Sequence, residues 1–448
     1  MYNEKTIEKL KQKILDLAVR GKLVPQDPSD EPASVLIEKI RKEKEKLIKE
    51  GKIKKPKEDS FIFKGSDNLY YENVSGKIKC IQDEIPFEIP ESWVWCRLGN
   101  ISEIIQGTSY KKEDIKKDGI RIIRGGNIYN YKLTFNDDDI FVDYKYIDKT
   151  KQLKKNDIVI VSSTGSSNAL GKPAFVAKDL EKTQIGAFIR IVRCCNIINS
   201  NYLFMIYQTL YYKTYIIKEL TGTNINNLNN KYILNMFVSI PPLKEQEKII
   251  NKYNRILNFI ENIQKEYDIT NKIKKQLKNK VLNFIFSPNS SYKSYYENDF
   301  NLGDILEYEQ PGPYIVKNTD YNDNFDIPVL TPGKTFILGY TDEKDGIYKA
   351  NKDNKVIIFD DFTTASRLVD FDFKVKSSAM KILHISGKSK FDIEYMYYLL
   401  QTINIIVDTH KRFWISEYAP LKVKIHTYDE QIRIKNKIKS VFETIDNL

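Results

Sequence analysis

The chain has 448 residues and a formal net charge of +11. Its length predicts two or three domains. Its charge favours a polyanionic partner, nucleic acid first, because no amphipathic anchor or lipidation signal points to a membrane surface. The apolar runs are shorter than a membrane span and the first residues lack an apolar signal core, so we expect a cytoplasmic protein. The four cysteines and three histidines show no metal-ligand spacing, which argues against a zinc site.

Two short helices are predicted at the start of the chain. Residues 4–19 carry apolar side chains spaced by three and four, and Gly21 with the turn-rich stretch behind it ends this helix. Ser34 is a favourable N-cap for a second helix that runs to about Lys49. Residues 39–57 are rich in lysine and arginine, which is typical of a solvated helix face or of an arm that contacts phosphates or a protein.

Two globular units are predicted further along. Residues 61–240 contain short β-rich runs separated by turns, with a helix near Asn201–Glu219, and indicate a mixed α/β domain. A second unit with similar strand-like runs begins at about Asn301 and includes a helix near Ile393–Thr402. The chain ends in another amphipathic helix, Asp429–Leu448.

The longest predicted helix, Ile249–Phe286, lies between these units and contains no proline or glycine. At 1.5 Å per residue it would measure roughly 57 Å. Its apolar residues recur at alternating intervals of three and four, which is the heptad spacing of coiled coils, so this face must pack against another helix. The residues of this predicted seam are Tyr253, Ile256, Ile260, Ile263, Tyr267, Leu277, Val281 and Phe284.

Parts of the sequence repeat. The first helix resembles the second half of the central helix, and the last helix resembles its first half. The simplest geometry places both terminal helices antiparallel to the central one, with two similar units related by a pseudo-twofold axis. The repeated pairs are 10–18 with 277–285, 98–101 with 302–305, and 238–260 with 423–445.

Catalytic signatures are missing, including those of a nucleotide-binding loop and of an S-adenosylmethionine site. One cluster leaves an alternative open: Asp360, Asp361 and Asp372 with Lys374. Two-metal hydrolysis needs converging acids with a nearby lysine, so a magnesium-dependent DNA endonuclease is the second interpretation. The same acids lie at strand ends, where turns use them equally well.

The pairs Glu245-Gln246 and Glu430-Gln431 occupy equivalent places in the repeat, each in the first turn of a predicted helix. Their position suits charge and capping contacts at a helix N-terminus. The alternative interpretation is a docking feature for a partner protein.

Several loops combine small, polar and basic residues. Arginine can pair with guanine and asparagine with adenine, while hydroxyl groups hold phosphates. Two such sets on repeated units of a basic chain favour DNA. The predicted DNA-binding residues are Arg121, Arg124, Asn127, Ser163, Thr164, Ser166, Asn168, Thr223 and Asn224 in the first unit, and Lys334, Thr335, Thr363, Thr364, Ser366, Arg367, Lys411 and Arg412 in the second.

A rigid central helix with one reader at each end would fix the distance between two half-sites. At about 3.4 Å per base pair its length corresponds to roughly 17 base pairs. A bipartite DNA site with an unread spacer would follow.

With these features the chain resembles the specificity subunit of Type I restriction-modification systems. The resemblance covers nearly the whole sequence and rests on Lys13–Arg41, Asp83–Ile101, Ile240–Ile250, and residues 307–321 and 356–383. It implies two target-recognition domains, at 61–240 and 290–425. Conserved helical segments would occupy 1–60, 241–289 and 426–448 and form long antiparallel coiled-coil helices.

The same resemblance implies a non-catalytic subunit that binds double-stranded DNA. Two copies of a methylation subunit would dock on its helices and supply S-adenosylmethionine and adenine-N6 chemistry, so this chain would hold no cofactor and no metal. Restriction subunits would join in some complexes.

Overall fold

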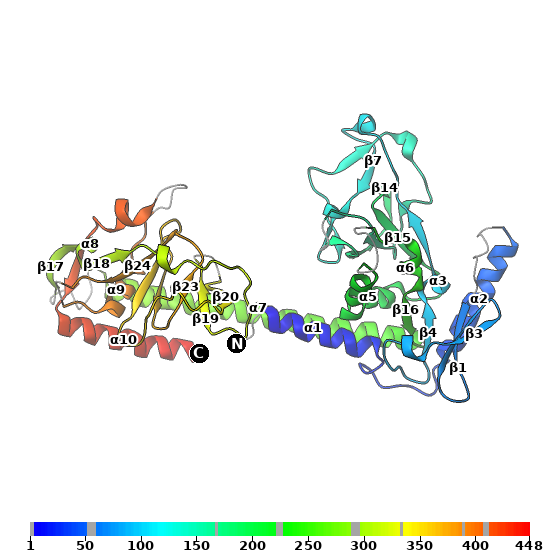
Figure 1. The fold of residues 1–448 in the computed structure, drawn as a ribbon, viewed down its shortest axis with the longest axis horizontal. Coiled ribbons are helices and arrows are strands. Elements are labelled where there is room, and N and C mark those ends of the chain that lie inside the picture. The colour runs from blue at the N-terminus through cyan, green and yellow to red at the C-terminus, as the bar shows by residue number, and fades with distance from the viewer. Residues whose placement is uncertain are drawn as a thin grey trace. The chain divides into compact units, whose positions relative to one another are not determined.

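The computed structural model describes residues 4–51, 60–165, 169–220, 227–287, 296–331, 335–387, 390–405 and 412–448. Contacts divide the chain into unit 1, Met1–Ile263, and unit 2, Gln264–Leu448. The helix α7 (Leu243–Ile285) begins in the first and ends in the second (Figure 1). The finer five-part division and the pseudo-twofold arrangement stay predictions.

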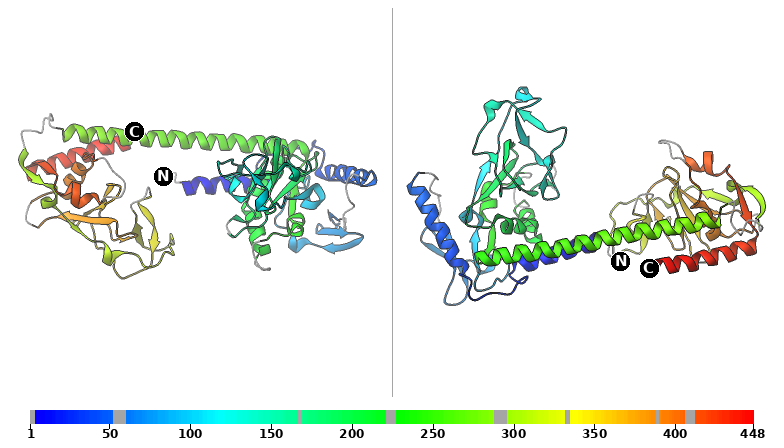
Figure 2. Two further views of the ribbon diagram at one scale, coloured as in Figure 1. Left: turned by 90° about the horizontal axis from the view of Figure 1, so that it is seen from above. Right: turned by 180° about the vertical axis from the view of Figure 1, so that it is seen from behind.

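The helices at the start of unit 1 confirm the expected pattern. Helix α1 (Glu4–Val19) runs antiparallel to α7: Glu8 lines one cavity with Glu261, whereas the Val19 carbonyl accepts a hydrogen bond from Ser239, just before α7 begins. Figure 2 shows the two helices alongside one another. Helix α2 (Ala33–Lys49) begins one residue before Ser34, so Ser34 is not its N-cap.

Three sheets build most of the rest of unit 1, with a further strand pair at its base. The predicted helix near Asn201–Glu219 is two helices, because the Thr209 hydroxyl accepts a hydrogen bond from Tyr212 N and starts a new turn. The sheets have the orders β5-β15-β12-β13-β9-β8, β11-β14-β7-β10-β6 and β1-β2-β3, and β16 pairs with β4. The helices are α3 (Leu98–Ile101), α4 (Ser200–Gln208), α5 (Leu210–Leu220) and α6 (Asn230–Asn235).

The strands of unit 1 are short. They are β1 (Ser60–Lys64), β2 (Tyr70–Val74), β3 (Lys77–Cys80), β4 (Val94–Arg97), β5 (Ser102–Gln106), β6 (Ile115–Lys116), β7 (Ile120–Ile123), β8 (Ile128–Tyr129), β9 (Lys132–Leu133), β10 (Ile140–Val142), β11 (Gln152–Leu153), β12 (Ile158–Val161), β13 (Pro173–Phe175), β14 (Leu180–Ile185), β15 (Ile189–Cys194) and β16 (Phe237–Ile240).

Unit 2 contains a smaller version of the same plan. Its sheets have the orders β18-β24-β21-β22 and β20-β19-β23, and β17 pairs with β25. The elements are β17 (Tyr296–Asn301), α8 (Leu302–Ile305), β18 (Leu306–Glu309), β19 (Ile327–Leu330), β20 (Ile337–Thr341), β21 (Val356–Asp360), β22 (Ser366–Val369), β23 (Lys374–Val375), β24 (Met380–Ile385), α9 (Ile393–Leu400), β25 (Lys422–His426) and α10 (Tyr428–Asp446).

Helix α10 also runs antiparallel to α7. Its last residue, Asp446, pairs with Lys278 at 2.7 Å, and its earlier turns share a core with Leu282 and Ile285 near the end of α7. Figures 1 and 2 show α10 beside this part of α7. Each terminal helix therefore packs on α7 within its own unit, as the repeat predicted.

The predicted seam of α7 is correct in part. Tyr253 and Ile260 are buried, and Ile256 and Val281 pack against the cores of their units. Ile263, Leu277 and Phe284 are exposed instead, and Leu282 and Ile285 take the buried positions near the end of the helix. A straight helix advances 100° per residue, so it drifts about 20° per heptad away from a strict seven-residue repeat. Continuing the strict heptad across Thr270 and Lys274 therefore predicted burial for Leu277 and Phe284, which are exposed.

The internal repeat is visible in matching hydrogen bonds. Ile14, Leu15 and Ala18 of α1 pack into the core of unit 1, and their repeat partners Val281, Leu282 and Ile285 pack into that of unit 2. Corresponding backbone bonds, each 2.9 Å, are Leu98 N to Met236 O and Leu302 N to Leu421 O, and Cys195 N to Ile101 O and Ser386 N to Ile305 O.

Within the described residues, each helix is too short or too polar to cross a lipid bilayer.

Candidate nucleic-acid interface

In unit 1, several strands end at the same place. Parallel strands β7 and β14 end together, with Gly186 N donating to Ile123 O at 2.9 Å. At the end of β12, Ser162 N donates to Phe188 O at 2.8 Å, and Leu228 N donates to Ser162 O at 2.7 Å. These bonds bring residues 124–127, 162–165, 186–188 and 227–229 together, and we call them the strand-end loops of unit 1.

Unit 2 builds the equivalent loops with the same bonds. Lys376 N donates to Leu330 O at 2.8 Å, between parallel β19 and β23. Asp361 N donates to Ala379 O, and Phe413 N donates to Asp361 O, each at 3.0 Å. The strand-end loops of unit 2 are residue 331, residue 335, and residues 361–365, 376–379 and 412–413.

These two sets of loops contain many of the predicted DNA-binding residues. Arg121 lies in β7 instead, and Ser366 and Arg367 lie in β22. Ser166, Asn168, Thr223, Asn224, Lys334 and Lys411 lie outside the described residues. The predicted residues that the loops bring together are Arg124, Asn127, Ser163 and Thr164 in unit 1, and Thr335, Thr363, Thr364 and Arg412 in unit 2.

Arg124 and Asn127 play different parts in their loop. The Asn127 side chain is only 2% exposed, accepts a hydrogen bond from Arg124 N, and donates to Asp139 Oδ1 and to Thr134 O. With both ends of its amide used inside the protein, Asn127 cannot reach a base, so its predicted DNA contact is wrong and it positions the loop instead. The Arg124 side chain is partly exposed, donates to the Asp138 carbonyl at 3.0 Å and lies 3.7 Å from the Asp138 carboxylate.

Arg121 is held within unit 1. Its Nε lies 3.2 Å from Asp139 Oδ2, and its guanidinium stacks 4.7 Å from the Phe135 ring and 5.0 Å from the Phe141 ring. These contacts join β7 to β10, two inner strands of the sheet, beside the Arg124 loop. A DNA contact by Arg121 stays a prediction.

The loop of unit 2 that follows β21 is organised by two buried carboxylates. Asp360 Oδ1 accepts hydrogen bonds from Phe362 N and Thr363 N, which closes a turn and presents Thr363 to solvent. Asp361 Oδ1 accepts from Trp414 N at 2.8 Å, and Asp361 Oδ2 lies 3.6 Å from the ammonium group of Lys381. Both carboxylates therefore stabilise the loop through hydrogen bonds and an ion pair within unit 2.

The remaining members of the predicted nuclease cluster are also used elsewhere. Asp372 pairs with Lys349 at 2.6 Å, and Lys374 is buried and bonds the carbonyls of Asp345 and Gly346. Among the described residues, no group of three histidine, cysteine, aspartate or glutamate side chains could hold a metal ion. The four residues do not converge on one point, so the geometry gives the endonuclease alternative no support.

The repeated glutamines are internal connectors. Gln246 is fully buried, accepts from Asn199 N at 3.0 Å and donates to Pro241 O at 3.0 Å. Gln431 does the same with Asp392 N at 3.0 Å and His426 O at 2.9 Å. Each one joins the start of a packed helix, α4 or α9, to the helix that carries it. Their predicted role in partner docking is wrong, because no surface is left to contact a partner.

The repeated glutamates are buried as well. Glu245 accepts hydrogen bonds from Trp93 Nε1 at 3.0 Å and from Gln26 Nε2 at 2.7 Å. Burial raises the pKa of Glu245, although these hydrogen bonds act in the opposite direction. Glu430 lies 3.5 Å from Arg433 and is also buried. Burial corrects the predicted docking role of Glu245 and Glu430 too.

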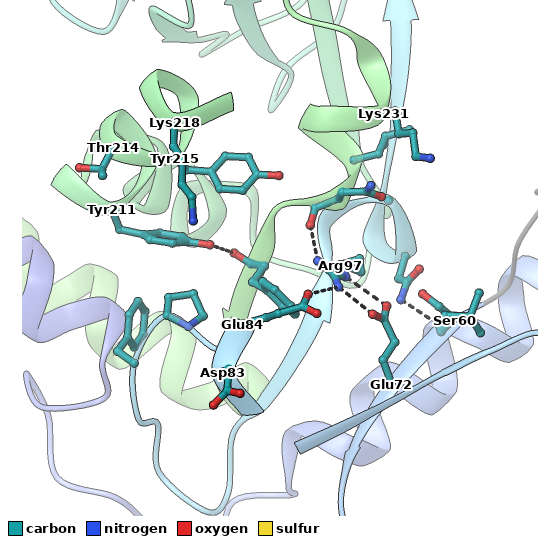
Figure 3. A pocket seen from close by; sticks show the side chains of 18 of the residues that line it. Ser60, Glu72, Asp83, Glu84, Arg97, Tyr211, Thr214, Tyr215, Lys218 and Lys231 are labelled. Atoms are coloured by element: carbon teal, nitrogen blue, oxygen red, sulfur yellow. Dashed lines mark hydrogen bonds and ion pairs between the residues drawn. The ribbon is translucent and has the colours of Figure 1, made fainter. Parts of the chain in front are cut away.

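A cavity of about 1010 Å³ lies apart from these loops, between α5 and β4 (Figure 3). Arg97 is its central charge and bonds Glu72 at 2.7 Å and the Asn235 carbonyl at 2.9 Å. Its guanidinium also lies 3.8 Å from the centre of the Phe237 ring. Because its guanidinium donors are used in these contacts, Arg97 stabilises the fold around the cavity.

The DNA-binding residues predicted from the sequence did not include Phe188, which lies in the strand-end loops of unit 1. Its side chain is an exposed aromatic ring between two buried strands. The sequence alone did not single out Phe188, because its place depends on strand pairing: it directly precedes Ile189, which pairs with Val161 at the end of β12.

The fold and its loops define a structural class: a protein with two similar α/β units, each of which has polar loops at the ends of its strands. Residues 90–281 match the family described as "Type I restriction modification DNA specificity domain". The chain is 50% identical over 147 residues to the EcoR124I/EcoR124II specificity subunit of Escherichia coli, a match that covers 32% of this chain and 36% of that protein.

A second relative, the EcoAI specificity subunit of Escherichia coli, is 34% identical over 261 residues, which cover 57% of this chain and 40% of that protein. These matches span less than half the length of either relative. A solved structure titled for complex assembly and conformational transition of the type I R-M system has the same fold. It aligns with a TM-score of 0.52 and 12% identity over 81% of this chain and 93% of that chain. Residues 90–281 are thus similar to the Type I restriction modification DNA specificity domain, and the fold of the chain is that of the solved structure.

Proposed function

We propose that this chain is the DNA-reading subunit of a Type I restriction-modification complex. The strand-end loops of unit 1 read one half of a bipartite site, and those of unit 2 read the other half. The observation that carries this proposal is the matched pair of loop sets, built by equivalent hydrogen bonds and holding polar and basic side chains at the surface. The names of its relatives and the positive charge of the chain support it.

The chain does no chemistry itself in this proposal. A methylation subunit supplies S-adenosylmethionine, flips the target adenine out of the duplex and methylates it at N6. A restriction subunit joins some of these complexes. The role of this chain is to position its partner subunits, because its loops determine where on the duplex those subunits act.

Arg124→Ala is expected to weaken binding to the bipartite site about tenfold and to relax base preference in one half only. A guanidinium that contacts a guanine edge supplies on the order of 1–3 kcal/mol of discrimination. Arg124 can do so because its ion pair with Asp138 is long, at 3.7 Å, and the Asp138 side chain is 82% exposed. The measurement is fluorescence anisotropy of the full chain on duplexes selected from a random library, at several salt concentrations.

Arg193→Lys is not a suitable control, because Arg193 forms a salt bridge of 2.7 Å with the buried Asp157 and its loss would affect the fold. Lys46→Ala, an exposed cation on α2, is the matched control and should leave base preference unchanged. Equal loss on every sequence would make Arg124 a phosphate contact. Absence of salt-dependent DNA binding by the wild-type chain would overturn the proposed function itself.

We also propose where the methylation subunit docks. In unit 2, α7 carries four exposed apolar residues: Ile269, Ile273, Leu277 and Phe284. At 100° per residue they lie within about 80° of one another on the helix. The side of α7 that meets α10 is a different one, marked by Lys274 and Lys278, which bond Asp446. We call these four residues the α7 stripe, and an apolar partner helix suits it.

The double variant Ile273→Glu with Leu277→Glu should reduce binding of the methylation subunit about 100-fold or more, because two carboxylates would be buried in an apolar interface. Titration calorimetry with the methylation subunit of the same system measures it. Leu338→Glu, at an exposed apolar position of β20, is the control. Unchanged binding by the double variant would exclude the α7 stripe as the docking face.

A further inference from the structure

Phe188 is an exposed aromatic residue in the middle of the strand-end loops of unit 1. Its side chain is 66% exposed, whereas Ile185 and Ile189 on either side are fully buried. Hydrogen bonds from Ser162 and Ser163 to its carbonyl place it beside the predicted DNA-binding residues. A phenylalanine that is two-thirds exposed gives the fold little apolar burial, so its position needs another explanation.

The backbone that carries this ring is fixed. The Phe188 carbonyl accepts hydrogen bonds from Ser162 N at 2.8 Å, Ser162 Oγ at 3.0 Å and Ser163 N at 3.2 Å. The Arg190 guanidinium bonds the carbonyls on both sides, Ala187 O at 2.7 Å and Ile189 O at 2.9 Å. Because this backbone is already ordered, binding through the ring loses little conformational entropy of the loop.

Unit 2 shows that the fold does not require the ring. In unit 1 the Ser162 amide donates to the carbonyl of Phe188. In unit 2 the equivalent amide, that of Asp361, donates to the carbonyl of Ala379. Strand pairing agrees, since Val161 pairs with Ile189 and Asp360 pairs with Met380. The same connection is thus built once with phenylalanine and once with alanine, and the ring belongs to a task of unit 1 alone.

We propose that the Phe188 ring contacts the C5-methyl group of a thymine in the half-site read by unit 1. This inference rests on the proposed function. Base edges in the major groove are polar apart from that methyl group, which apolar side chains recognise. The neighbouring Arg124, Ser163 and Thr164 provide the polar contacts that the other base edges need. Unit 2, with Ala379, makes no equivalent contact.

The test combines a change in the protein with a change of one methyl group in the DNA. Duplexes are first selected from a random library with the wild-type full chain, and each thymine of the selected site is then replaced by deoxyuridine. One replacement, in one half-site, should weaken wild-type binding about fourfold, the effect of burying one methyl group. Phe188→Ala should weaken binding about tenfold on the thymine duplex and should be insensitive to that replacement.

Phe188→Leu, which keeps an apolar side chain, should retain part of the sensitivity. Phe259→Ala, at a phenylalanine of α7 that is 64% exposed and lies outside the α7 stripe, is the matched control and should behave as wild type in DNA binding. The inference is overturned if no single deoxyuridine weakens binding, if Phe188→Ala keeps the sensitivity, or if its loss is equal on unrelated duplexes. In each of those outcomes wild-type selection of a bipartite site would still stand, which separates this inference from the proposed function.

Discussion

Asp361→Ala is expected to destabilise unit 2 by about 3–5 kcal/mol. The substitution removes the carboxylate beside Lys381, whose side chain is 1% exposed, and leaves a buried, uncompensated ammonium group. It also removes the acceptor of Trp414 N. Hydrogen exchange of the β24 amides reports the stability of unit 2 separately from that of unit 1, so the loss should appear there.

Asp372→Ala is the matched control, because Asp372 belongs to the same predicted nuclease cluster but forms only a solvent-exposed pair with Lys349. Its effect on stability should be below about 1 kcal/mol. Magnesium-dependent DNA cleavage by the purified chain, lost in both variants without a change in hydrogen exchange, would contradict this account of Asp361 and restore the endonuclease interpretation.

Gln246→Leu is expected to destabilise unit 1 by about 2–4 kcal/mol, because leucine leaves Asn199 N and Pro241 O buried without partners. Gln431→Leu should have a similar effect on unit 2, where it removes the acceptor of Asp392 N and one donor to His426 O. The measurement is hydrogen exchange of α4 amides for the first variant and α9 amides for the second.

Glu247→Gln, at the exposed position next to Gln246, provides the control and should change stability by less than about 0.5 kcal/mol. If Gln246→Leu leaves the exchange of α4 unchanged but weakens binding of the methylation subunit, the glutamine is a docking residue and its assignment as an internal connector fails.

The helices and the repeat were predictable because they depend on local periodicity. Helix α7 has apolar residues at helical spacing and contains no proline or glycine, and α1 matches its second half closely enough for Leu15 and Leu282 to be recognised as equivalent. The predicted burial of Leu277 and Phe284 was wrong, because the true period of 3.6 residues departs from the heptad along the helix.

The loops were predictable as polar segments but not as a site. Arg124 and Ser163 come together only because β7, β12 and β14 end at one place, and strand order cannot be read from the sequence. Burial separated residues of similar appearance: Asn127 is enclosed by Asp139 and Thr134, while Arg124 stays at the surface. For the same reason the glutamine pair looked like a docking feature until its partners were visible.

The central claim is that each unit reads its own half of the DNA site. Its most direct test is to map modified adenines in cells that contain the methylation subunit together with the wild-type chain, Arg124→Ala, or Arg412→Ala. Arg412 is an exposed residue in the strand-end loops of unit 2. We predict a two-part modified sequence in which Arg124→Ala alters one half and Arg412→Ala alters the other. An uninterrupted modified sequence, or one in which both variants alter the same half, would contradict the claim.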